Sequence, residues 1–354
     1  MTMMPLGIDA VLQPVVDGGS RRGIPAAAEI HEKVGYAASF SREHSGNPFL
    51  PVALAATSTE RIELGTSVSI AFARSPMDTA YLAHDLQALT DGRFVLGLGT
   101  QIRPHITRRF SMGWDKPTVR MGDYITALKA IWASWRDGTR LDHVGPYYQH
   151  TLMTPAFTPQ DHGHGDPLVH LAAVGPAMTN VAATLADGLI THPFASSEYQ
   201  RQITVPQVEA TLSNRGRSRE NFRISGSVLV ATGRTDAEMD TAITALRARI
   251  AFYGSTPAYR KVLEFHGWEE VGDRLHALSV SFDPGKWDAM AEAIPDEMLR
   301  TIGIVAKPEH LADEVRTRYE GVLERICINN VVSSSTEIID DVVADLVRKQ
   351  RVAG

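Results

Sequence analysis

A chain of 354 residues with 44% hydrophobic content is long enough to bury a large core, either as one barrel or as two smaller domains. Its formal net charge of -6 contains no block of like charges, which argues against a nucleic-acid or membrane surface and favours a small-molecule partner. A single cysteine, Cys327, excludes an internal disulfide and a multi-cysteine metal site, and with no signal peptide or apolar span the sequence predicts a cytoplasmic protein.

The first half of the chain alternates short apolar runs, typical of strands, with amphipathic runs that are typical of helices. Strands are predicted over residues 6–12, 36–41, 62–71 and 94–98. Helices are predicted over residues 24–33, from near Pro76 to Leu89, and over residues 117–135. Another helix is predicted to begin at Asn47 and Pro48. Residues 138–159 are irregular, and we expect them to form an excursion with a small hairpin.

The second half continues the same alternation. Strands are predicted over residues 168–173, 189–191, 223–231 and 326–332, and helices over residues 177–186 and 196–213. Residues 249–306 are too long for a plain connection, and we expect a helical insertion that forms a lid or an oligomer contact. The alternation predicts a single domain over residues 1–354, a (β/α)8 TIM barrel with a helical insertion after strand 7, and a doubly wound sheet is the alternative.

The most informative stretch is GRFVLGLGTQ at residues 92–101, which reads as a turn, a buried strand and a glycine-bearing exit. Gly97 and Gly99 remove side chains where a flat ligand could lie against the backbone. On this motif alone, an equally good explanation is structural: the glycines only relieve crowding in a barrel core. Thr100 and Gln101 add a hydroxyl and an amide at the carboxyl end of the strand.

Several strings, taken together and in this order, resemble the bacterial-luciferase-like superfamily of flavin- and deazaflavin-dependent oxidoreductases. They are GRFVLGLGTQ, LGTSVSIAFARSP at residues 64–76, the Glu43-His44 pair before NPFLP, AAVGP at residues 172–176 and ADGLITHP at residues 186–193. GLGTQ followed by RPHITRRFSM is similar to a branch that depends on coenzyme F420, an 8-hydroxy-5-deazaflavin. The resemblance implies a site at the carboxyl ends of barrel strands and, by family habit, a homodimer or higher homo-oligomer.

The resemblance places Glu43 and His44 beside the reactive centre of the cofactor ring as catalytic residues. A histidine exchanges a proton near neutral pH, and a neighbouring carboxylate is expected to fix its tautomer or raise its pKa. The alternative is a loop histidine with a helix-capping partner. The resemblance also implies that Ser69 and Ile70 form a bulge with a non-prolyl cis peptide that supports the ring from behind.

Further cofactor contacts are implied for Gly99, Thr100 and Gln101, at the ring edge or the ribityl chain. Some family members that oxidise an alcohol have a glutamate where this chain has Gln101, which does not take a proton at neutral pH. That departure favours reduction or mono-oxygenation over alcohol oxidation.

The start of the helix after the fifth strand is implied to hold the cofactor phosphate. There Ala173, Gly175 and Pro176 would present backbone amides, with His192 beside them. For Gly175, simple helix entry is the competing explanation.

Two other polar segments have plainer explanations. Arg103, His105, Arg108 and Arg109 could bind a polyanionic cofactor tail or an acidic substrate, or they could form a solvated loop face. The DHGHGD segment at residues 161–166 is predicted to be an exposed loop, and no metal site is expected.

The sequence therefore predicts a coenzyme F420-dependent oxidoreductase that transfers hydride to or from a small organic substrate. An FMN-dependent luciferase-like monooxygenase is the alternative. A non-catalytic flavin-binding barrel is a further alternative, whereas a metal-dependent barrel hydrolase would need more histidines and carboxylates at the strand ends.

Overall fold

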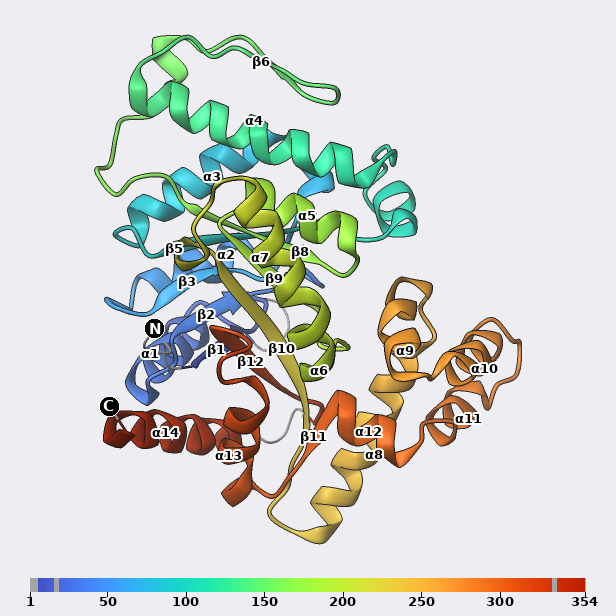
Figure 1. The fold of residues 1–354 in the computed structure, drawn as a ribbon. Helices are drawn as coiled ribbons and strands as arrows, with labels where there is room; N and C mark the ends of the chain where they lie inside the picture. Colours follow the sequence, from blue (N-terminus) through green and yellow to red (C-terminus); the bar gives the residue numbers. More distant parts are fainter. Residues whose placement is uncertain (1–5, 16–18, 333–335, 354) are drawn as a thin grey trace.

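The computed structural model describes residues 6–15, 19–332 and 336–353. Eight parallel strands close into a barrel in the order β12-β1-β2-β3-β5-β8-β9-β10, and β10 pairs back onto β12 (Figure 1). They are β1 (Gly7–Leu12), β2 (Ala38–Ser41), β3 (Glu63–Thr66), β5 (Phe94–Gly99), β8 (Leu168–Ala173), β9 (Gly188–Thr191), β10 (Arg223–Ala231) and β12 (Arg325–Asn330). The predicted (β/α)8 TIM barrel is confirmed.

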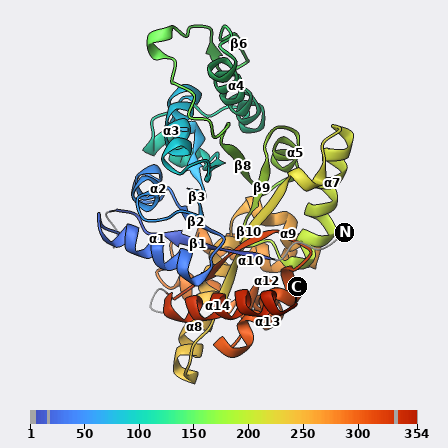
Figure 2. The same ribbon diagram turned by 90° about the vertical axis from the view of Figure 1, so that its left-hand side faces the viewer.

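Helices surround the strands and bury their apolar faces against the outside of the barrel (Figures 1 and 2). They are α1 (Gly23–Val34), α2 (Phe49–Ala56), α3 (Pro76–Leu89), α4 (Pro117–Asp137), α5 (Pro176–Leu185), α6 (Ser197–Tyr199), α7 (Val205–Asn214), α8 (Asp236–Gly254), α13 (Pro308–Tyr319) and α14 (Thr336–Ala353). Proline in the first turn of α3, α4 and α5 suits a helix start, because the missing N–H has no partner there in any case. None of the helices in the described ranges is both long and apolar enough to cross a lipid bilayer.

The third predicted strand, residues 62–71, is interrupted. β3 ends at Thr66, β4 covers only Ser69–Ile70, and the 3-10 helix η1 (Ala71–Ala73) follows. The amide of Ser67 still donates to the carbonyl of Ser41, the last residue of β2, at 2.7 Å, whereas β4 pairs with β5 alone. The prediction of one continuous strand was wrong here, because the β-branched composition of this run does not reveal the change of strand partner.

The helical segment after β10 stands to one side of the barrel (Figure 1). Beyond α8 it contains η6 (Pro257–Tyr259), α9 (Arg260–His266), α10 (Glu269–Ser279), α11 (Lys286–Glu292) and α12 (Asp296–Ile302). A second apolar core joins these helices to Leu229 of β10. The expected insertion at residues 249–306 thus begins inside α8 and ends in a short strand, β11 (Gly303–Val305), which pairs with β10.

The excursion predicted at residues 138–159 contains the expected hairpin. Its antiparallel strands are β6 (His143–Val144) and β7 (Gln149–His150), and they project beyond α4 (Figure 1).

Charged side chains cross the barrel interior near the amino ends of the strands. Arg223 in β10 forms two hydrogen bonds, of 2.7 and 3.1 Å, with Glu63 in β3, a strand that is not its neighbour. Arg325 donates from Nε to Asp9 at 2.7 Å and approaches Glu63 at 3.3 Å. His170 is buried beside them, and burial lowers the pKa of its imidazole to about 3. This end of the barrel is therefore filled by a closed ionic network, which leaves the carboxyl end for ligands.

Candidate active site at the carboxyl ends of the strands

The two glycines of β5 face the barrel interior. Gly97 is in register with His170, an interior residue, and Gly99 lies two residues further along the same face. A Cβ at Gly97 would lie 1.9 Å from the carbonyl oxygen of Thr66, so close strand packing alone requires this glycine. A Cβ at Gly99 would lie 2.7 Å from Cγ2 of Val68. Crowding thus accounts for Gly97, whereas Gly99 lies at the strand end where only the Val68 side chain is in the way.

The non-prolyl cis peptide lies between Ser67 and Val68, two residues before the implied position at Ser69 and Ile70. The implied position was wrong because Ser69 and Ile70 form a regular parallel ladder with β5, in which Ile70 is in register with Gly99. This register turns Ile70 toward the barrel interior and Ser69 toward the surrounding helices. Both residues are buried, so only their backbone and the Ile70 side chain are oriented toward the barrel mouth.

Glu43 is a buried carboxylate whose oxygens are taken up by structural partners. It accepts a 2.7 Å hydrogen bond from the amide of Ile70 and two 2.8 Å hydrogen bonds from the guanidinium of Arg74. These contacts join the loop after β2 to β4, so Glu43 positions the backbone there. Arg74 belongs to the LGTSVSIAFARSP string but received no role from the sequence, although a lone arginine directly after an apolar run was the available signal.

His44 follows Glu43 and is exposed at the mouth of the barrel. Its carbonyl accepts a 2.7 Å hydrogen bond from Arg109 in the π-helix η2 (His105–Arg109), which follows β5. Partial desolvation of the ring by its neighbours lowers the pKa of the His44 imidazole, and the guanidinium groups of Arg42, Arg109 and Arg249 lower it further. The expectation that a neighbouring carboxylate raises this pKa was wrong, because the Glu43 carboxylate is paired elsewhere and positive charge dominates around the ring.

Thr100 and Gln101 form the turn that leaves β5. The Thr100 hydroxyl donates to the carbonyl of Gln101 at 2.9 Å, and the Gln101 side-chain oxygen accepts from the amide of Ile102 at 3.0 Å. Gln101 has a φ of 60°, a left-handed conformation that is uncommon for a residue with a side chain. Both side chains thus fix the shape of the turn. The amide of Gln101 does not transfer a proton at neutral pH.

The start of α5 has the features of an anion site. Gly175 is the N-cap, makes no side-chain cap, and has open space where a Cβ would stand. Pro176 is the first helical residue, and Ala173 ends β8 two residues before the cap. By contrast, α8 begins with a complete capping box at Thr235. The uncapped amides at the start of α5 therefore suit a phosphate group.

His192 follows β9, and the structure turns it toward the insertion. Its Nδ1 accepts from the amide of Phe194 at 3.2 Å, and its Nε2 lies 2.9 Å from the hydroxyl of Tyr259. The ring stacks on Tyr259 at 4.2 Å and meets Tyr253 edge-on at 4.7 Å. Burial lowers the pKa of the imidazole to about 3, so His192 is neutral and joins the insertion to the barrel. The sequence had not indicated this role of Tyr253 and Tyr259.

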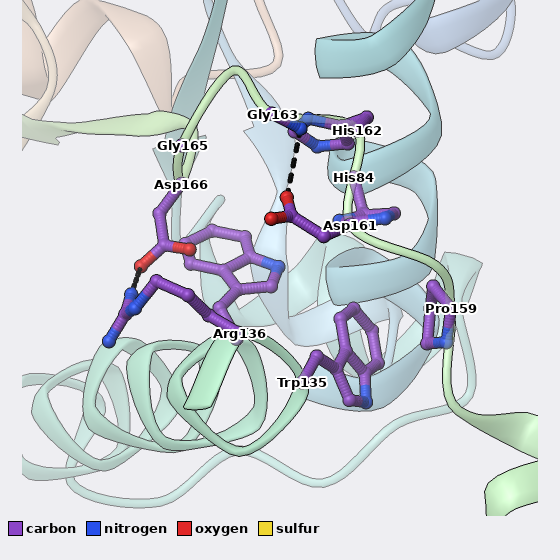
Figure 3. Close-up of a pocket in the computed structure, with 10 residues that line it drawn as sticks. His84, Trp135, Arg136, Pro159, Asp161, His162, Gly163, Gly165 and Asp166 are labelled. Atoms are coloured by element: carbon purple, nitrogen blue, oxygen red, sulfur yellow. Dashed lines mark hydrogen bonds and ion pairs between the residues drawn. The ribbon is translucent and has the colours of Figure 1, made fainter. Parts of the chain in front are cut away.

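The DHGHGD segment lies on the outer wall of the barrel, where it covers a pocket between α3 and α4 (Figure 3). The carboxylate of Asp161 accepts from the amide of Gly163, and Asp166 pairs with Arg136. No group of three or more potential metal ligands occurs within the described ranges. The residues that line this pocket belong to α3, α4 and residues 159–166, so the pocket is separate from the site at the carboxyl ends of the strands.

The family model for luciferase-like monooxygenase matches residues 9–325, which contain six of the eight barrel strands in full, most of β1 and the first residue of β12. The chain belongs to the luciferase-like monooxygenase family. Membership in this family makes it an oxidoreductase, as the sequence predicted.

Named relatives of this luciferase-like protein come from bacteria and archaea. An uncharacterised protein of Mycobacterium tuberculosis is 46% identical over 322 residues, which cover 91% of this chain and 94% of that protein. A putative coenzyme F420-dependent oxidoreductase of the same organism is 28% identical over 301 residues, 80% of this chain and 84% of that protein. Among solved structures, the coenzyme F420 dependent tetrahydromethanopterin reductase of Methanopyrus kandleri aligns with a TM-score of 0.78 and 17% identity, covering 98% of this chain and 99% of that one.

Proposed function

We propose that the protein is a coenzyme F420-dependent oxidoreductase, which transfers hydride between the deazaflavin and a small organic substrate at the carboxyl end of the barrel. The proposal rests on the similarity to a protein named as a putative coenzyme F420-dependent oxidoreductase, which is 28% identical to this chain over 301 residues. The cytoplasmic location and the homo-oligomeric state remain predictions.

The described residues fit a cofactor with a flat ring and an anionic side chain. The backbone amides at the uncapped start of α5 would bind the phosphate, and no atom of the described residues occupies the space beside Gly175 where a side chain would stand. Backbone at Gly99 and Thr100 borders the place where the ring would lie, and Ile70 faces it from β4. Glu43 would not contact the ring but would hold the backbone at Ile70 in place.

When bound, the deazaflavin supplies a carbon that gives or accepts a hydride, and the protein manages the accompanying proton. His44 is the titratable group at the mouth that fits this task. Because its pKa is lowered, the imidazole is mainly neutral at pH 7 and is ready to accept a proton. A neutral imidazole can accept a proton from a substrate that is oxidised, and in the reverse direction it can return a proton to a substrate that is reduced.

An FMN-dependent monooxygenase is the second candidate, because the matching family model is named for luciferase-like monooxygenases. The backbone contacts at the start of α5 would serve either cofactor equally. Gln101 does not distinguish F420 from FMN. Its amide lacks the acid that alcohol oxidation in this fold would use, and this absence concerns the substrate and not the ring.

A side-by-side titration with F420 and FMN tests the proposal. We expect F420 to bind with an affinity at least tenfold higher than FMN, and Gly175→Val to weaken binding by closing the space over the α5 amides. Binding of FMN alone would replace the proposal with the alternative, and binding of neither would refute both. Isotope exchange at the deazaflavin carbon then separates an enzyme from a non-catalytic binder, with His44→Asn as the variant that binds F420 but exchanges slowly.

A further inference from the structure

Three arginines from separate elements converge around His44. Arg42 directly follows β2, Arg109 closes η2, and Arg249 lies in α8. The positive charges of all three lower the pKa of the His44 imidazole, so the three guanidinium groups lie around the same part of the barrel mouth. They are scattered through the sequence, and only the closed barrel brings them together.

Arg42 reaches across the mouth of the barrel. Its Nη2 lies 3.6 Å from Sγ of Cys327 in β12, a strand separated from β2 by β1. Burial raises the pKa of the Cys327 thiol, so the thiol is uncharged and does not neutralise the guanidinium. The Cys327 thiol therefore offers the Arg42 guanidinium no opposite charge.

The other two arginines approach the same region from the rim. Arg109 donates from Nη2 to the carbonyl of His44 at 2.7 Å. Arg249 is one helical turn before Tyr253, whose ring meets His192 at 4.7 Å, so the same face of α8 carries Arg249 toward the strand ends.

No carboxylate lies within ion-pair distance of Arg42, Arg109 or Arg249 in residues 6–15, 19–332 and 336–353. Arg74, which follows β4, is by contrast matched by Glu43. Three positive charges at one mouth, without a carboxylate partner among the described residues, attract an anion and raise its local concentration.

We propose that Arg42, Arg109 and Arg249 bind an anionic group of the substrate, a carboxylate or a phosphate ester, beside His44. The proposal rests on the proposed function, because it assigns the substrate class of that same site. Guanidinium groups suit this task, since their planar donors match both oxyanions in a bidentate geometry. The arginines would hold the substrate by its charge and so set which of its carbons meets the cofactor.

In the test, inorganic phosphate is titrated into the full-length protein, and NMR measures the pKa of the His44 imidazole as the reporter. Phosphate beside His44 is expected to raise the pKa of the imidazole, because an opposite charge favours the protonated form. The double variant Arg42→Gln/Arg249→Gln should bind phosphate at least tenfold more weakly. The matched control Arg140→Gln/Arg274→Gln removes the same charge from exposed sites away from the mouth and should bind like wild type. Equal phosphate affinity in the two double variants, or no response of His44, would overturn the proposal.

A second arm separates the substrate from the polyanionic tail of the cofactor. F420 and its riboside, which lacks the tail, are titrated into wild type and the Arg42→Gln/Arg249→Gln variant. The proposal requires the variant to bind both like wild type. Weaker binding of F420 with unchanged binding of the riboside would assign the arginines to the tail and overturn the proposal. Failure of wild type to bind F420 would refute the proposed function, whereas the phosphate titration would still decide whether the anion site exists.

Discussion

The buried imidazoles of His170 and His192 are expected to make the fold sensitive to acid. Burial lowers the pKa of each from 6.5 to about 3. Below pH 6.5 the unfolded chain takes up a proton at each histidine, whereas the folded protein does not until the pH approaches 3. The free energy of unfolding therefore decreases as the pH falls through this window, by about 2 kcal/mol for each histidine between pH 7 and pH 5.

Asp9 acts in the opposite direction. Burial raises the pKa of its carboxyl from 3.8 to about 6, although Arg325 partly counters this. The folded protein thus takes up a proton at Asp9 before the unfolded chain does, and gains about 1 kcal/mol between pH 7 and pH 5. Together the two histidines and Asp9 predict a net loss of about 3 kcal/mol over this interval.

The variant His170→Asn isolates one of these contributions, and His310→Asn, at an exposed position, is its control. Urea unfolding at pH 7 and pH 5 gives the pH-dependent loss within each protein, so a generally less stable variant remains informative. We expect the control to match wild type and His170→Asn to lose about 2 kcal/mol less. The same pH-dependent loss in both variants would show that His170 is not held neutral, and would refute the reasoning.

Two further substitutions probe the rim of the site. Glu43→Gln leaves the guanidinium of Arg74 unpaired in a mostly buried position, and should lower the free energy of unfolding by about 3 kcal/mol in urea denaturation; an unchanged midpoint would contradict the positioning role. Gly99→Ala brings a methyl group to within 2.7 Å of the Val68 side chain, and should weaken F420 binding at least tenfold by fluorescence titration, whereas Gly113→Ala, with open space around it, should not. Equal affinities of the two alanine variants would remove Gly99 from the cofactor site.

The barrel was predictable because its strands are short apolar runs separated by amphipathic ones, and this alternation survives in any single sequence. Residues 94–98 are a clear case, since both faces of this strand are buried. Residues 169–171 in the middle of β8 are buried in the same way. The break between β3 and β4 was not predictable, because β-branched residues recur along residues 62–71 on both sides of the break, and the switch of strand partner depends on contacts with β5.

The interior ion network was also missed, although the sequence held a signal for it. Asp9, Glu63, Arg223 and Arg325 are each an isolated charge in or beside an apolar strand, where an unpaired charge would be costly. Which of them pair depends on the closure of the barrel, and the separations in sequence reach 316 residues. The arginines around His44 were hidden for the same reason, since Arg42 and Arg249 share no local pattern.

The pairing of Arg325 with Asp9 has a consequence for synthesis of the chain. β1 is translated before the other seven barrel strands, but its second neighbour in the sheet, β12, is the last of the eight to be translated. Until Arg325 emerges, β1 and β10 each expose an open edge, and the carboxylate of Asp9 has no guanidinium from β12. Chains that stop before β12 should therefore be prone to aggregate through these edges, and release of β12 from the ribosome is the step that removes the hazard.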